Sequence, residues 1–255
     1  MSIGVCINTY NREDAFIKCY DSLPHDSIDE LIIVKDGGIE YNCLDTRVSR
    51  RDKDYTVLDF VSNNGVATSK NAGLAYLNHK KCDHIFLIED DIIVKDPKVF
   101  DVYISTAKKT GVYHLNFSKI ASNKIIHSTD DLDLHEKCQG AFMYMYKGVV
   151  KNIGGFDQGF INAFEHIEWY YRCSQKGLVP PFWWFADAKN SDKYICENID
   201  VETTISGKGN YKENLQKSAN HFFAKYNKNV KDIPKHNLGY VINDLKRIEK
   251  HYSRT

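Results

Sequence analysis

Three adjacent carboxylates in the sequence have the types and spacing that suit metal chemistry. Glu89, Asp90 and Asp91 follow four apolar residues at 85–88 and precede a second apolar run at 92–94. Three like charges repel one another, and a divalent cation at the end of a strand would neutralise them. Oxygen ligands suit Mg²⁺ or Mn²⁺, and either ion would also stabilise a diphosphate leaving group. Considered alone, the triplet is explained equally well by a solvated acidic turn.

The elements expected around this triplet alternate between strand and helix. In chain order, the apolar runs and the helical spacings predict a strand, a helix, two strands, a helix and a strand at residues 3–7, 15–23, 31–34, 55–61, 66–77 and 85–88. This order is typical of an α/β fold with a mostly parallel central sheet flanked by helices. Ligands bind such sheets beyond the carboxyl ends of the strands. The polar clusters at 9–12, 36–38 and 89–91 each follow a strand, so we expect them to converge on one edge.

The rest of the chain is less regular. Strands are expected at 141–146 and 182–185, and helices at 167–177, 211–226 and 238–252. We find no repeat and no low-complexity linker, which predicts a single domain over 1–255. Within it, residues 1–95, which contain the three polar clusters, would form a ligand-binding half, residues 96–205 a second half, and residues 206–255 a basic helical region.

The cysteines and the hydropathy indicate a cytoplasmic globular protein. Seven cysteines, an odd number, are scattered without any Cys-x-x-Cys pair, so neither a zinc site nor a redox motif is expected. A reducing compartment fits such a set best. We expect no signal peptide and no transmembrane segment, because the sequence has neither a basic leader nor an apolar run of about eighteen residues.

The charges balance overall but are unevenly distributed. The chain has 34 basic and 34 acidic side chains, yet residues 206–255 carry eleven Lys or Arg against four Asp or Glu, an excess of seven. Two interpretations stay open. The excess is either a solvated helical surface or an attraction for an anionic donor, acceptor, nucleic acid or peripheral membrane contact.

Five segments resemble family-two glycosyltransferases, which have the GT-A fold. Residues 86–94 resemble the strand and Asp-x-Asp motif of that family. The others are similar to its opening strand and Thr/Ser-x-Tyr-Asn-Arg loop, its Asp-Asp-Gly-Ser segment, its Asn-x-Gly…Ala-Arg-Asn-x-Gly pattern and its Gly-Gly-Phe-Asp turn, at residues 5–12, 30–38, 64–74 and 154–160. Each segment is weakly specific alone, but all five occur in the family's order.

The resemblance implies a donor site for a nucleotide-diphosphate sugar. Thr9, Tyr10, Arg12 and Asp36 occupy positions that hold the base and ribose, and an aspartate that accepts the uracil imide proton favours a UDP-sugar. Lys35 stands where the family usually has its first aspartate, which leaves the base open.

Asn64 and Lys70 belong to the same donor site by this resemblance. Lys70 stands where the family often has arginine, and it would reach the donor phosphate as a point charge.

The resemblance also implies metal ligands. Asp91 aligns with the aspartate that binds Mn²⁺ or Mg²⁺ directly, whereas Asp90 and Glu89 would contact the ribose or a metal-bound water. GT-A enzymes often complete the site with a C-terminal histidine, for which His221 is the candidate. The alternative is a histidine on an ordinary helix face.

Three residues are candidates for the catalytic base of an inverting transfer. A carboxylate usually takes the acceptor proton, in a Glu-Asp-x-Asp segment after the Gly-Phe-Asp turn. Here the segment contains Glu165, His166 and Glu168, with histidine in place of the usual aspartate. Any of the three fits the role. The acidic pair would alternatively act only on the dipole of the helix that it opens.

The expected function is transfer of a sugar to a hydroxyl group, most simply on a glycan. A hydroxylated base in viral or phage DNA is an alternative acceptor, because the C-terminal region is basic. Two other classes compete with a transferase. A nucleotidyltransferase would carry a glycine-rich loop after its first strand, which is absent, and a non-catalytic nucleotide- or carbohydrate-binding module would lack the base.

Overall fold

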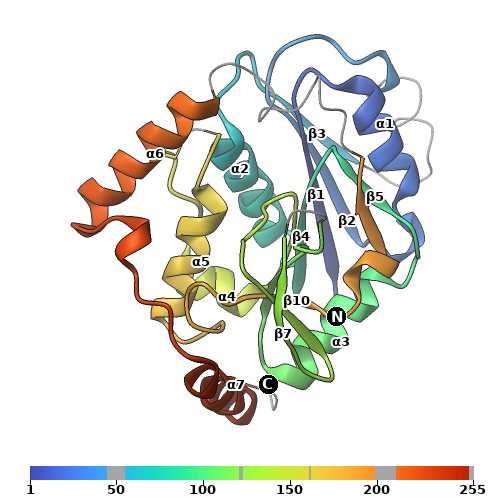
Figure 1. The fold of residues 1–255 in the computed structure, drawn as a ribbon. Coiled ribbons are helices and arrows are strands. Elements are labelled where there is room, and N and C mark those ends of the chain that lie inside the picture. The colour runs from blue at the N-terminus through green and yellow to red at the C-terminus, as the bar shows by residue number, and fades with distance from the viewer. Residues whose placement is uncertain (45–54, 121–122, 161, 199–210, 253–255) are drawn as a thin grey trace.

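The computed structural model describes residues 1–44, 55–120, 123–160, 162–198 and 211–252, and here a mostly parallel sheet lies between helices (Figure 1). The strands are β1 (Ile3–Thr9), β2 (Glu30–Lys35), β3 (Thr56–Asp59), β4 (His84–Glu89), β5 (Ile92–Val94), β6 (His114–Asn116), β7 (Ile125–Ser128), β8 (Leu132–His135), β9 (Phe142–Tyr146), β10 (Phe185–Ala188) and β11 (Ile195–Glu197). The α-helices are α1 (Glu13–Ser22), α2 (Val66–His79), α3 (Val99–Thr110), α4 (Lys147–Ile153), α5 (Glu165–Gln175), α6 (Tyr211–Tyr226) and α7 (Leu238–Tyr252). Short 3₁₀ helices are η1 (His25–Ser27), η3 (Ser191–Lys193) and η5 (Val230–Asp232).

The central sheet has the strand order β3-β2-β1-β4-β9-β6. Strands β3, β2, β1 and β4 are parallel, with Cys6 of β1 facing Ile32 of β2 and Leu87 of β4. Strand β9 joins β4 in the antiparallel direction, and β6 pairs antiparallel with β9. The predicted class, a mostly parallel sheet flanked by helices, is therefore confirmed.

The middle of the sheet is covered on both faces. All seven residues of β1 are buried, and so are the first five of β4. Continuous apolar runs of this kind are typical of parallel strands between two helical layers. Helix α2 packs across β1, β2 and β4, while α1 lies on the other side of these strands (Figure 1).

Two smaller sheets complete the side of the molecule around β4. Strands β10, β8 and β7 form an antiparallel sheet. Strand β11 pairs with β5, which sets Glu197 opposite Ile92, one residue after the acidic triplet. This pairing brings a distant carboxylate to the end of β4.

The observed elements confirm some predicted boundaries and correct others, among them the helix predicted at 167–177, which is observed as α5 at Glu165–Gln175. Helices α6 and α7 coincide with the predicted ranges 211–226 and 238–252, and α1 ends at Ser22 because Leu23 takes the extended conformation required before Pro24. The strand predicted at 182–185 begins only at Phe185, because Trp183 has φ +76° and cannot continue a strand.

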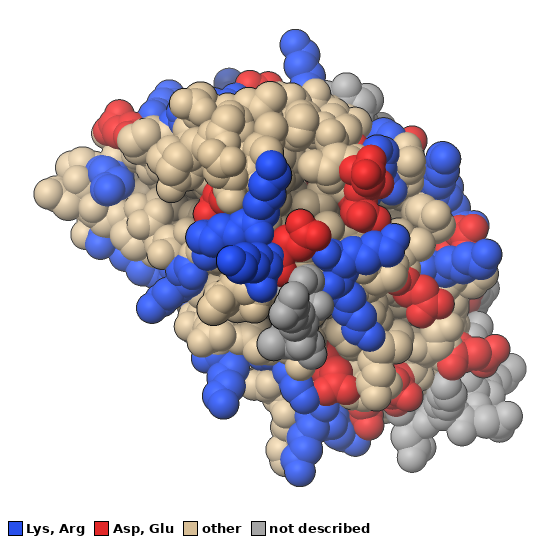
Figure 2. Space-filling view, turned by 90° about the horizontal axis from the view of Figure 1, so that it is seen from below, with Lys and Arg blue, Asp and Glu red and all other residues tan. Residues whose placement is uncertain are grey.

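The basic C-terminal helix α7 packs against α3 and turns its charges outward. Val241 and Ile248 are buried, whereas Lys246 and Lys250 are exposed. Figure 2 shows the face seen from below, where Asp and Glu side chains lie among the Lys and Arg side chains. Among the described residues, no helix is both long and apolar enough to cross a membrane.

The contact between α2 and β1 depends on the absence of a side chain at Gly73. A Cβ atom there would lie 2.2 Å from Cys6 Sγ and 2.8 Å from Cys6 Cβ. Both cysteine atoms belong to a central strand that cannot move away without shifting its neighbours. The helix therefore lies close to the sheet because residue 73 is glycine.

We predict that Gly73→Ala destabilises the protein by about 1–3 kcal/mol, because overpacking outweighs the gain in helix propensity. The matched control is Gly239→Ala in exposed α7, where the nearest contact of a Cβ would be 3.4 Å. That change should be neutral or stabilise by up to about 1 kcal/mol. Urea unfolding measures both free energies, and equal effects of the two substitutions would contradict the close-packing argument.

Candidate active site

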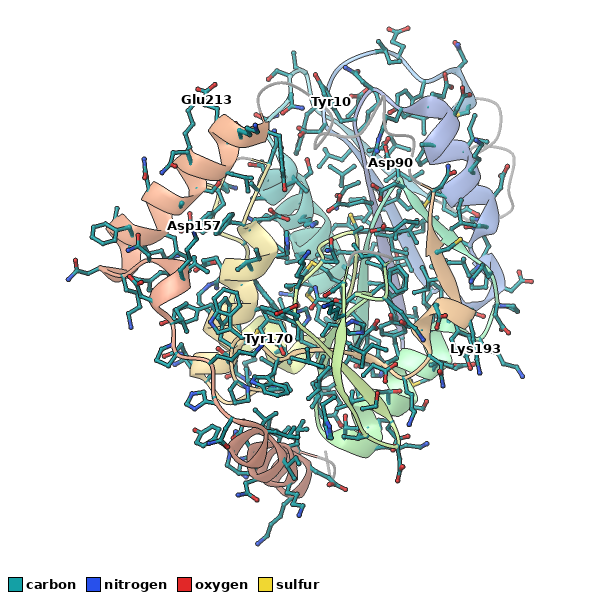
Figure 3. The ribbon with its side chains drawn as sticks, viewed as in Figure 1. Tyr10, Asp90, Asp157, Tyr170, Lys193 and Glu213 are labelled. Carbon is teal, nitrogen blue, oxygen red and sulfur yellow. The ribbon has the colours of Figure 1, made fainter. Side chains whose placement is uncertain are left out.

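The ends of β1, β2 and β4 bring the predicted polar clusters together. The N–H of Asp36 donates to Thr9 O at 2.9 Å, and the N–H of Asp90 donates to Asn8 O at 3.2 Å. The backbone ladders thus continue one residue past the strands, so the side chains that follow are neighbours. Figure 3 shows Tyr10 and Asp90 at this edge of the sheet.

Asp90 lies buried at the centre of this edge and holds the loop after β1. It accepts hydrogen bonds from Thr9 Oγ1 at 2.7 Å and from the Arg12 guanidinium. The phenol of Tyr41 supports the same loop, since it accepts from the Arg12 N–H at 2.7 Å and lies 2.8 Å from Thr9 Oγ1. Burial raises the pKa of Asp90 to about 6, although Arg12 acts in the opposite direction.

The negative charge of Asp91 is only weakly compensated by a neighbouring cation. Its Oδ2 lies 3.7 Å from Arg12 Nη1, and its buried Oδ1 has no hydrogen-bond partner. Burial, followed by repulsion from Glu89, raises the pKa of Asp91 to about 7, and Glu197 adds to this repulsion. Sequence reasoning missed Glu197, because nothing near it in the chain indicates that β11 pairs beside the triplet.

The residues at this position fit a divalent cation that binds together with a diphosphate. In the part of the chain that the structure describes, no three His, Cys, Asp or Glu side chains gather closely enough to hold an ion themselves. Mg²⁺ is typically held by one or two carboxylates and by substrate phosphates. Asp91 Oδ1, which has no hydrogen-bond partner among the described residues, suits that arrangement.

His221, the predicted additional ligand, lies elsewhere. Its Nε2 is 3.2 Å from Asp157 Oδ2, and its ring packs edge-on against Phe160, with 4.6 Å between ring centroids. Figure 3 shows Asp157 beside α6, away from Asp90. The structure therefore does not bring His221 to Asp91, because Asp157 and Phe160 hold its ring at the base of α6.

The second predicted donor cluster lies where α2 begins. Asp36 accepts from the N–H groups of Asn64 at 2.7 Å and Gly65 at 2.9 Å. A carboxylate at a helix N-terminus is stabilised by the free N–H groups there. Asn162, which sequence reasoning missed, accepts from the Val66 N–H at 3.2 Å. Lys35 forms an ion pair with Asp59 at 2.8 Å.

Lys70 is fully buried and joins the two sides of the site. Its ammonium group donates to Glu89 Oε1 at 2.8 Å, Gly140 O at 2.9 Å and Glu165 Oε1 at 3.1 Å. Burial disfavours the charge, but Glu89 and Glu165 outweigh it and raise the pKa of Lys70. All three N–H donors are used. Lys70 thus lies between β4 and α5, and its predicted contact with a donor phosphate stays a prediction.

Glu165 and His166 form a hydrogen-bonded pair at the start of α5. His166 Nδ1 lies 2.9 Å from Glu165 Oε1. Burial would raise the pKa of Glu165, but His166 and Lys70 outweigh it and hold that pKa below its ordinary value. A Cβ at Gly140 would lie 2.7 Å from His166 Nδ1, so the imidazole packs directly on the backbone.

Glu168, the third predicted candidate, has a different environment. It is completely buried and accepts from Arg172 Nε at 2.9 Å, Lys225 Nζ at 2.9 Å and the phenol of Tyr226. Lys225 also bonds Asp157 at 2.6 Å. Glu168 thus connects α5 to α6 and does not line the cleft that contains Glu165 and His166.

One cleft of about 620 Å³ runs through these groups. Its lining contains Arg12, Glu89, Asp91 and Glu197, and also the Glu165–His166 pair, which Lys70 links to Glu89. Glu136, Trp183 and Lys231 line it as well. These three belong to one part of the cleft, because Trp183 bonds Ile233 O and Glu136 lies 4.0 Å from Lys235, both in the segment that follows Lys231. The cleft volume is within the usual range for ligand sites. A smaller cavity, which shares Arg12 and Glu89 with the cleft, is lined by Thr9, Tyr10, Arg12, Asp36 and Asp90.

Solved structures share this architecture. TarS from S. aureus matches with a TM-score of 0.56 and 12% identity, covering 100% of this chain and 87% of that chain. The mannosyltransferase PcManGT from Pyrobaculum calidifontis, solved in complex with GDP-Man and Mn²⁺, matches with a TM-score of 0.58 and 14% identity, covering 98% of this chain and 69% of that chain. The likeness shows that the fold is GT-A, as the sequence predicts.

Sequence comparison agrees with the fold. An uncharacterized glycosyltransferase of Acanthamoeba polyphaga mimivirus is 23% identical over 235 residues, which cover 85% of this chain and 90% of the viral protein. Residues 4–147 match the sequence profile of glycosyl transferase family 2. That match spans more than half of the 255 residues and contains both the loop that follows β1 and the carboxylates that follow β4. The protein is therefore a glycosyltransferase and belongs to glycosyl transferase family 2.

Proposed function

We propose that this glycosyltransferase moves a sugar from a nucleotide-diphosphate sugar to a hydroxyl group of a glycan, with inversion and with the help of Mn²⁺ or Mg²⁺. One observation carries the proposal. A single cleft is lined both by the Glu89 and Asp91 carboxylates with Arg12 and by the Glu165–His166 pair. In this proposal residues 1–95 bind the donor, and residues 96–205 supply the base and much of the acceptor site.

The smaller cavity is the proposed site of the nucleotide. Tyr10 offers a ring on which a base can stack, and Asp36 retains free lone pairs after accepting two backbone N–H groups, enough for a uracil imide. Solved relatives differ in the donor, since TarS was crystallised with UDP and UDP-GlcNAc and PcManGT with GDP-Man. We favour UDP because of Asp36.

Asp91 is the proposed metal ligand, and Glu89 and Glu197, whose charges act on Asp91, would interact with water molecules bound to the ion. When bound, a divalent cation would neutralise the diphosphate and make it a better leaving group. Arg12 lines both cavities and pairs with Asp90 and Asp91, so its guanidinium is the protein cation available to the phosphates.

His166 is the proposed base, and Glu165 is the residue that positions it. The Glu165 carboxylate only accepts hydrogen bonds, so His166 Nδ1 carries the proton and Nε2 has the free lone pair. Nε2 takes the proton of the acceptor hydroxyl while that oxygen attacks the anomeric carbon. The bond from that carbon to the diphosphate breaks in the same step, which inverts the configuration. The intact pair also argues against a binding module without a base.

Asp91→Asn should abolish metal-dependent donor binding. In the wild type, UDP with Mn²⁺ at about a hundred times its dissociation constant should raise Tm by roughly 5–10 °C. EDTA should remove most of this rise, and Asp91→Asn should remove it without EDTA. Thermal shift with UDP, GDP and their sugars measures the effect and identifies the base.

The matched control is Asp101→Asn on exposed α3, which should retain the full shift. A shift that persists in Asp91→Asn, or that is indifferent to metal in the wild type, would remove Asp91 from the metal site. No shift with any nucleotide would contradict the donor site as a whole.

Substitutions in α5 should separate the base from the structural carboxylate. His166→Ala should lower kcat by about 100-fold or more while donor binding is retained, because proton transfer in the transition state is lost. Glu168→Gln should leave kcat within about threefold but lower the free energy of unfolding by about 1–3 kcal/mol, because the buried carboxylate loses charge-assisted hydrogen bonds from Arg172 and Lys225. Steady-state kinetics and urea unfolding measure the two quantities. The reverse result, with kcat lost only in Glu168→Gln, would make Glu168 the base.

A further inference from the structure

The three tryptophans of the chain have different environments. Trp169 is fully buried and donates to Gly154 O at 3.0 Å. Trp184 is also buried and donates to His236 O at 3.0 Å. Trp183 alone of the three is half-buried, and it lines the cleft in the part that also contains Lys231 and Glu136. A half-buried indole that lines a cleft has surface available for a ligand.

The backbone and the packing hold the Trp183 ring in place. Its Nε1–H donates to Ile233 O at 2.7 Å, and the ring packs edge-on against Phe182, with 4.9 Å between centroids. Its φ of +76° is unusual for a bulky residue, and strain of this kind persists where the surroundings require it, often at ligand sites. The strained turn between the two tryptophans directs Trp184 to the core and leaves Trp183 at the cleft.

The basic C-terminal region contributes one lysine to this part of the cleft. Lys225 is engaged by Asp157 and Glu168, and exposed Lys228 lies outside the cleft. Lys231 lines the cleft on η5, two residues before the carbonyl that holds Trp183. Among the described residues Lys231 forms no ion pair. An exposed ammonium group beside an aromatic ring suits an anionic sugar.

Other charged side chains also line the cleft. Glu136 lines the same part and lies 4.0 Å from Lys235, while Lys137 also lines the cleft. A carboxylate beside the ring can accept hydrogen bonds from sugar hydroxyls. A nucleic acid would instead need a track of Lys and Arg along its phosphates, and Glu136 interrupts any such track here.

We propose that this part of the cleft binds a glycan acceptor whose sugar ring stacks on Trp183 and whose phosphate or carboxylate group pairs with Lys231. The inference rests on the proposed transferase function and specifies the acceptor as an anionic sugar. His166 lines the same cleft as Trp183 and Lys231, so a sugar bound here would share one cavity with the proposed base.

Intrinsic tryptophan fluorescence tests the proposal, because Trp183 is the one half-buried tryptophan. Glucose 1-phosphate and glucuronate should each be titrated into the full chain, with glucose, inorganic phosphate and an oligothymidylate as comparisons. We expect saturable quenching by at least one anionic sugar, and which of the two binds more tightly distinguishes phosphate from carboxylate. Glucose should bind at least about fivefold more weakly, because it lacks the charge.

Two pairs of variants test which residues the quenching and the affinity for the anionic sugar depend on. Trp183→Phe should lose the quenching, whereas Trp184→Phe should retain it. Lys231→Glu should weaken binding of the anionic sugar by about fivefold or more, and the loss should be larger at low salt. Lys228→Glu should leave this affinity unchanged. The UDP-induced Tm shift should persist in all four variants. This control separates failure of the acceptor proposal from failure of the donor site or of folding.

Three results would overturn the inference. They are quenching by neither anionic sugar, equal binding of glucose and glucose 1-phosphate, and quenching by the oligothymidylate alone. The last would favour a nucleic-acid acceptor. In each case a retained UDP shift would leave the transferase proposal standing.

Discussion

The buried ammonium group of Lys70 connects the two sides of the cleft. It lies on α2 and donates to Glu89 at the end of β4 and to Glu165 at the start of α5. A buried charge is costly unless it is paired and fully hydrogen-bonded, and here both conditions are met. Glu165 is therefore held as a carboxylate in one position, and that position determines which His166 nitrogen carries a proton. Glu89, Glu165 and His166 therefore belong to one electrostatic network.

Helix α5 serves a second network on its other side. Glu168 accepts hydrogen bonds from Arg172, Lys225 and Tyr226. The start of α5 therefore faces the cleft, while its next turn anchors α6. Asp157 contacts His221 and accepts a further hydrogen bond from Lys225. Residues that sequence reasoning assigned to proton transfer and metal binding thus hold α6 beside the site. Since Tyr211 and Leu215 of α6 line the cleft, this anchoring helps to shape its wall.

The donor side was predictable because its signals are local. Apolar runs indicated β1, β2 and β4, and the carboxyl ends of parallel strands meet at one edge of a sheet. The sequence therefore predicted that Thr9, Asp36 and Asp90 lie close together. The antiparallel strands β6 to β8 and the β5–β11 pair were not predicted. These strands have only three or four residues each, too few for a clear period, and their partners are distant in the chain. Lys70 and His221 were assigned by motif position, which specifies where a residue stands but not what satisfies its side chain.

The same difference explains why the acceptor is harder to deduce than the donor. A nucleotide diphosphate is the same chemical group in many transferases, and its contacts come from loops that directly follow strands. The proposed acceptor site combines residues 136–137, Trp183 and residues 230–235, three segments without a shared sequence pattern. Only the tertiary structure distinguishes Trp183 from its neighbour Trp184, and Lys231 from Lys228. The proposed acceptor site is therefore a product of tertiary packing, and Trp183 and Lys231 lie outside the hydrogen bonds that Lys70 forms with Glu89, Gly140 and Glu165.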